Sequence, residues 1–293
     1  MAISELSCPE IEVRIKGWGL FKVPVGTEAK TLLKQFKGQI KYPVVGVIIN
    51  NNLRDLREVL DKSCQLEWVD TSSEIGVRIY TRSAAFLLIK AARDLFPDRS
   101  LIIKHSLSNG LFCEFIDGGT KPADVEQIKK RMREITAANL SIKQLVVSME
   151  EARQIFTRQG QIDKVKLFEF RDKEHVHISE LDGFYEYFYG YMVPETGMVD
   201  RFALLNYPPG LVLQTPELSS PGEIKPYIEQ RKLAAIFKEA KAWAEMLETP
   251  HVAALNDIIT SCDIGDIIRV NEALHEKKIA SIADQICSDK RIR

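Results

Sequence analysis

The chain has 293 residues, of which 45% are hydrophobic and 28% charged, a composition typical of a folded globular protein with one or two domains. Its 40 Lys and Arg nearly balance its 41 Asp and Glu, so the overall charge gives no reason to expect nucleic-acid binding, which would need a local patch. The five cysteines are never spaced Cys-x-x-Cys and no apolar run reaches the about 18 residues typical of a membrane helix, so we expect reduced thiols, a cytoplasmic location and no membrane partner.

The first 72 residues predict a small β-rich domain. Residues 10–15 and 20–25 alternate apolar and polar side chains around a Gly-Trp-Gly turn, which indicates a hairpin. A helix follows Gly26-Thr27, with an apolar side formed by Leu32, Leu33 and Phe36. Residues 44–49 and 65–69 indicate further strands. Strands and one helix in this order are consistent with a β-grasp fold.

Four lysines in and after this helix have the spacing of one helix face: Lys30, Lys34, Lys37 and Lys41. They could form a basic stripe that meets RNA phosphates. The alternative is an ordinary solvated face, because no aromatic residues are interleaved with the lysines. The stripe therefore predicts weak nucleic-acid binding at most.

The central element is a long helix over residues 73–97. Ser73 is a suitable N-cap, Pro97 is a stop, and apolar side chains recur near helical spacing at Ile75, Ile79, Phe86, Leu87 and Leu95. We expect an amphipathic helix with one buried face, against which the following segments pack.

The remaining segments alternate between strands and helices. Residues 100–104 and 110–115 indicate strands joined by a turn, and residues 122–134 a helix that begins at a proline. Ser148 and Glu151 form a capping-box pattern for a helix that ends at Gly160. A proline-rich, extended connector spans residues 204–226. A helix is then expected over 227–247, and a shorter one follows and ends at Thr260. Asp263 is the expected cap of a last helical segment, which runs to Ile286 as one helix or two.

Several of these segments together resemble the TGS and editing domains of threonyl-tRNA synthetases. The resemblance rests on five segments: Val23-Pro-Val-Gly-Thr27, the helix at 73–97, the Asn-Gly-aromatic strand at 109–112, Asp-Val-Glu with Lys-Arg-Met in the helix at 122–134, and Val193-Pro194. The resemblance implies an α+β fold, with a β-grasp TGS domain at 1–72, an editing-like domain at 73–224, and a helical segment at 225–293.

The editing domains of that family hold zinc with a His-x-x-x-His and a Cys-x-x-x-His pair. In this chain the four matching positions are Arg82, Phe86, Phe188 and Met192. A zinc site needs lone pairs that converge on one point, and a guanidinium or a phenyl ring provides none. We therefore predict no metal and no catalytic residue here, so hydrolysis of mischarged tRNA by a metal-bound water is not expected.

Two further sites contain histidines that could bind a ligand. His175 and His177 alternate on a predicted strand and so share a face, as two metal ligands would, but no third ligand is near in sequence, and exposed or packing histidines are the alternative. Lys104 and His105 form a cationic pair that could hold an anion at the mouth of the editing-like pocket, or simply occupy a surface loop.

Residues 272–286 and the basic end of the chain resemble the segment that, in bacterial uridine-kinase-like nucleoside kinases, leads into a P-loop kinase domain. The chain has no Gly-Lys dipeptide, hence no Walker A sequence. One hypothesis is that this is the non-catalytic, regulatory or ligand-binding N-terminal part of such a kinase, whose absent kinase domain would be its partner in cis and would alone bind ATP and Mg. The alternative is a free-standing RNA- or nucleotide-binding module derived from an editing domain.

Overall fold

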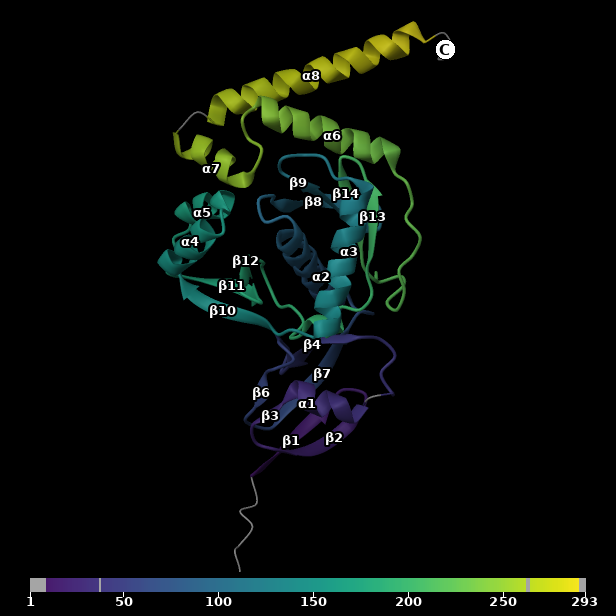
Figure 1. The fold of residues 1–293 in the computed structure, drawn as a ribbon, viewed down its shortest axis with the longest axis vertical. Coiled ribbons are helices and arrows are strands. Elements are labelled where there is room, and N and C mark those ends of the chain that lie inside the picture. The colour runs from purple at the N-terminus through teal and green to yellow at the C-terminus, as the bar shows by residue number, and fades with distance from the viewer. Residues whose placement is uncertain (1–8, 37, 262–263, 290–293) are drawn as a thin grey trace, which may run out of the picture. The chain divides into compact units, whose positions relative to one another are not determined.

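The computed structural model describes residues 9–36, 38–261 and 264–289 (Figure 1). It is a mixed α+β protein with several small sheets, as the sequence predicts at this level. The described residues form two compact units. The first comprises the chain up to Val147 together with Val176–Gln230, and the second comprises Ser148–His175 and the chain from Arg231 on.

The first unit begins with a five-stranded sheet in the order β2-β1-β7-β4-β5. Its strands are β1 (Glu10–Ile15), β2 (Gly19–Pro24), β4 (Val44–Ile49), β5 (Asn52–Arg54) and β7 (Cys64–Asp70). β1 pairs antiparallel with β2 and parallel with β7, and the short strands β3 (Thr27–Glu28) and β6 (Val59–Leu60) pair separately. Leu32 of α1 (Ala29–Leu33) and Phe36 of the following 3₁₀ turn (Lys34–Phe36) are buried with Val13 in one core. The helix is therefore much shorter than the lysine spacing suggests.

Helix α2 (Glu74–Leu95) is the centre of the second core of this unit. Its N-cap is confirmed, since the Ser73 hydroxyl accepts a hydrogen bond of 3.1 Å from the Gly76 N–H. Gly76 is needed there because a Cβ would lie 1.8 Å from the Asp70 carbonyl oxygen. The expectation of a single buried face is wrong. Most side chains from Ser83 to Ala92 are buried, on every side of the helix, whereas Ile75 is 40% exposed.

Two further sheets and one helix follow α2 in the sequence and share its core. A four-stranded sheet has the order β13-β14-β9-β8, and a three-stranded sheet the order β10-β11-β12. The strands are β8 (Leu101–Leu107), β9 (Gly110–Phe115), β10 (Ile142–Ser148), β11 (His175–Leu181), β12 (Phe184–Glu186), β13 (Ala203–Tyr207) and β14 (Gly210–Gln214). Helix α3 (Pro122–Ala138) packs against α2 and buries Val125, Ile128, Met132 and Ile135, the apolar residues at helical spacing.

The second unit is helical. It contains α4 (Met149–Arg158), α5 (Ile162–Glu169), α6 (Arg231–Met246), α7 (Val252–Ser261) and α8 (Ile264–Ser288). The capping box is confirmed by reciprocal hydrogen bonds between Ser148 and Glu151. Residues 264–288 form one helix, and the expected cap Asp263 lies outside the described residues. Within the described ranges, no helix combines the length and apolarity needed to cross a membrane.

Candidate functional site

The four positions singled out by the sequence lie where the segment after β12 meets α2. Two hydrogen bonds connect the two segments. The Val193 N–H donates to the Ser83 hydroxyl over 3.0 Å, and the Arg82 guanidinium donates to the Tyr191 carbonyl over 2.5 Å. Because Arg82 and Ser83 are neighbours on α2, the chain from 191 to 193 follows the helix surface at this level.

Apolar side chains fill the junction. The Phe86 ring is fully buried and contacts Phe188 edge-on, with ring centroids 5.8 Å apart, and Phe184 with centroids 6.1 Å apart. Met192 is 1% exposed and belongs to the same core cluster. Phe86 and Met192 thus belong to the buried core, and the partly buried Phe188 packs against it.

Arg82 occupies the polar edge of this junction. Burial, and secondly the charge of Arg78, lower the pKa of its guanidinium. A Cβ at Gly190, whose φ is +102°, would lie only 3.1–3.2 Å from the guanidinium atoms, so a glycine permits the close approach. Gln144 donates to the Gly190 carbonyl over 2.9 Å. Arginine has donors only, so Arg82 binds carbonyl oxygen here and is unsuited to hold a cation.

The histidine sites differ from one another. His175 and His177 are both exposed on β11, and among the residues that the structure describes no group of three or more His, Cys, Asp or Glu is placed to hold a metal. Lys104 and His105 lie within β8, the edge strand, so the surface-loop alternative is wrong. Lys104 is exposed. His105 is half-buried against Phe112, and burial followed by the charge of Lys104 lowers its pKa, against an opposing effect of Glu114.

The four lysines of the predicted stripe do not share one environment. Lys30 forms an ion pair with Glu195, and this pair is the main cause of the lowered pKa of that carboxyl. Lys34 is exposed, and Lys41 is exposed in the connection to β4, with its amine 5.0 Å from the centroid of the Tyr42 ring. Lys37 lies outside the described residues. Of the four stripe lysines, Lys34 and Lys41 are therefore the two that the structure shows exposed to solvent.

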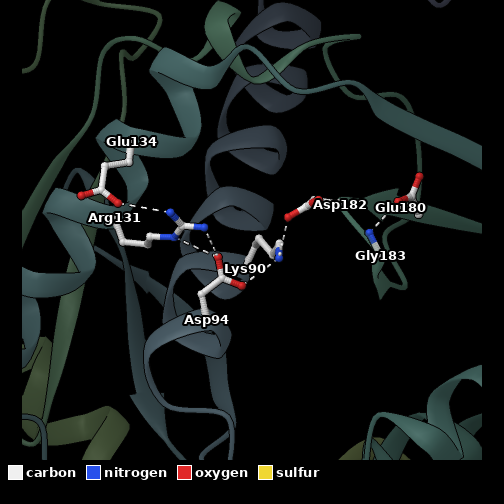
Figure 2. A network of polar contacts seen from close by, with 7 residues as sticks. All are labelled: Lys90, Asp94, Arg131, Glu134, Glu180, Asp182 and Gly183. Carbon is white, nitrogen blue, oxygen red and sulfur yellow. Dashed lines mark hydrogen bonds and ion pairs between the residues drawn. The ribbon is translucent and has the colours of Figure 1, made fainter.

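A polar network that the sequence analysis missed ties α2 to two other elements (Figure 2). The Lys90 side chain is 8% exposed and pairs with Asp94 at 2.7 Å and Asp182 at 3.3 Å. Arg131 of α3 bridges Asp94 at 2.8 Å and Glu134 at 3.1 Å. The i, i+4 spacing of Lys90 and Asp94 was the available signal. Lys90 and Asp94 lie on α2, and their partners Arg131 and Asp182 lie on α3 and in the β11–β12 turn. The ion pairs therefore connect these three elements.

No protein-family model matches the chain. Curated threonine–tRNA ligases are distant relatives. The chain is 29% identical to that of Francisella philomiragia over 196 residues, 66% of this chain and 31% of the relative. It is 28% identical to the Coxiella burnetii ligase over 186 residues, 63% of this chain and 28% of the relative. Identity to the Syntrophotalea carbinolica ligase is 32% over 163 residues, 55% of this chain and 26% of the relative. The chain thus matches less than a third of each relative.

Proposed function

We propose that this chain is a non-catalytic RNA- or nucleotide-binding module related to the TGS and editing region of threonyl-tRNA synthetases. The observation that carries the proposal is the similarity to threonine–tRNA ligases over as much as 66% of the chain. The sheet order β2-β1-β7-β4-β5, with a short helix buried against it, supports a β-grasp module at 1–72, followed by an editing-like module at 73–224.

The packing at the four former ligand positions supports the non-catalytic part of the proposal. Hydrolysis by a metal-bound water requires ligands with lone pairs and an open coordination position. Phe86 and Met192 are instead buried in the core, and Arg82 is hydrogen-bonded to a carbonyl. These side chains would leave binding as the function inherited from such a domain.

The expected binding is weak and electrostatic because the net charge is −1 and, within the predicted stripe, the described lysines that are exposed are Lys34 and Lys41. Neutralising two phosphates implies that log affinity falls with log salt at a slope of roughly −1.4 for single strands to −1.8 for duplex. Lys30 adds little to this slope, since its charge is engaged by Glu195.

The test measures fluorescence anisotropy of labelled tRNA with the full chain at several salt concentrations. Lys34→Glu should weaken binding, whereas Lys22→Glu, the same charge change at an exposed residue of β2, should have a smaller effect. Deacylation of mischarged threonine tRNA should be absent. Sub-micromolar, salt-insensitive binding would contradict the electrostatic basis, measurable deacylation would contradict the non-catalytic part, and no binding of RNA or nucleotide at all would overturn the proposal.

The hypothesis that this is the N-terminal part of a uridine-kinase-like nucleoside kinase stays a prediction. The relatives reported above are ligases, so they favour the binding module over the kinase. The kinase hypothesis requires a Gly-rich loop ending in Gly-Lys-Ser/Thr downstream of this chain, where ATP and Mg would bind. Sequencing the source gene past residue 293 decides it, because a stop codon there leaves no place for that loop.

A further inference from the structure

A cavity of about 320 Å³ lies on the N-terminal sheet, away from the junction around Phe86. It is bounded by the turn after β1, by residues 39–41 and by β7. Ligand pockets measure roughly 300–1,000 Å³, so this one has room for a single small ligand.

Two of the three tryptophans of the chain form its aromatic wall. Trp18 and Trp68 are both half-buried, and each packs against Phe36, with ring centroids 4.8 Å and 6.3 Å apart. The buried Phe36 therefore backs the indoles and limits their movement. The indole N–H of Trp68 is buried without a hydrogen-bond partner.

The polar residues of the cavity leave one cation uncommitted to a carboxylate. Lys16 pairs with Glu67 at 2.8 Å, and a carboxylate oxygen of Asp70 accepts hydrogen bonds from Ser72, with the hydroxyl at 2.6 Å. Lys41 stands at the rim with its amine above the Tyr42 ring. Gln39 adds an amide, which offers both donors and an acceptor.

These features together select among ligand classes. An apolar ligand would desolvate the charged rim without pairing it. Because Lys16 is paired with Glu67, Lys41 is the lysine of the cavity that is left for an anionic group. A planar heterocycle with an attached phosphate can use the indoles, the amide and Lys41. Its ring stacks on an indole, its polar edge pairs with Gln39, and its phosphate meets Lys41.

We propose that this cavity binds one nucleotide, with the base against Trp18 and Trp68 and the phosphate at Lys41. This inference rests on the proposed RNA- or nucleotide-binding function and assigns it a site. The size of the cavity fits a free mononucleotide or one unstacked nucleotide of single-stranded RNA, and not a duplex.

The experiment uses the full chain carrying Trp243→Phe, which removes the tryptophan of α6 so that all indole fluorescence comes from the cavity. It is titrated with AMP, with UMP, and with six-nucleotide oligo(A) and oligo(U) RNA. We expect saturable quenching. Trp18→Ala should weaken binding by roughly 5- to 150-fold, the range for removal of one base-stacking aromatic, as followed by anisotropy of labelled RNA. Lys41→Ala, a change at an exposed residue, should weaken binding and reduce the salt slope by about 0.7.

The outcomes separate the inference from the function on which it rests. Quenching by mononucleotides identifies a free nucleotide as sufficient, and quenching by oligonucleotides alone identifies single-stranded RNA as the source. RNA binding that is unchanged in both Trp18→Ala and Lys41→Ala overturns the cavity assignment and leaves the binding module standing. Absence of binding to tRNA, oligonucleotides and mononucleotides overturns both.

Discussion

Truncation of Phe86 tests whether the junction between α2 and the segment after β12 is packed as a core. The side chain is 0% exposed and lies between the rings of Phe184 and Phe188. Phe→Ala in a core costs about 3–5 kcal/mol, because burial is lost and a cavity remains. In folded units of this size, 1 kcal/mol corresponds to about 2–4 °C, so Phe86→Ala should lower the melting temperature by roughly 6–20 °C. Differential scanning calorimetry of the full chain measures this.

The matched control is Tyr189→Ala, an aromatic truncation in the same segment. Tyr189 is 87% exposed, and surface substitutions usually change the free energy of unfolding by less than about 0.5 kcal/mol. An unchanged melting temperature for Phe86→Ala would refute the reasoning. It would mean that the junction tolerates a cavity, and is therefore open enough to serve as a binding site.

Three further outcomes are expected. Ser73→Ala removes the acceptor for the Gly76 N–H and should cost about 0.5–2 kcal/mol in urea unfolding, and an unchanged midpoint would argue against the cap. Lys30 holds the pKa of Glu195 below its usual 4.5, so this contribution to stability is complete above that pH and is lost as the pH falls through the lowered pKa. The difference in stability between the wild type and Lys30→Met should therefore shrink on acidification, and a constant difference would contradict the pairing. Elemental analysis should find no stoichiometric zinc, whereas one zinc per chain after dialysis would disprove the absence of a metal site.

The elements that carry strong local signals were predictable. Ser73 and Pro97 bracket α2, and the Ser148–Glu151 pattern locates the start of α4, because a cap is a contact between residues three positions apart. Helix α5 was missed. Its N-cap Gln161 gives no side-chain capping hydrogen bond and Phe168 is the one buried residue of the helix, so neither capping nor periodicity signals it.

Long-range polar contacts were beyond the sequence. Lys30 looks like one member of a basic stripe until the fold brings it to Glu195, 165 positions away. Apolar residues likewise recur at helical spacing in α6, but Leu233 and Ile236 are 36% and 60% exposed. Periodicity identifies an apolar face but not what covers it, and that depends on tertiary packing.

Direct contacts connect α2 to the segment that ends in Val193-Pro194. In this chain the same two segments are joined by the hydrogen bonds from Arg82 to Tyr191 and from Val193 to Ser83, together with the contact between the Phe86 and Phe188 rings. Such packing stabilises the fold and fills the space between the two segments. Binding would then use other surfaces, such as the cavity of the N-terminal sheet, which is lined by Trp18, Trp68 and Lys41.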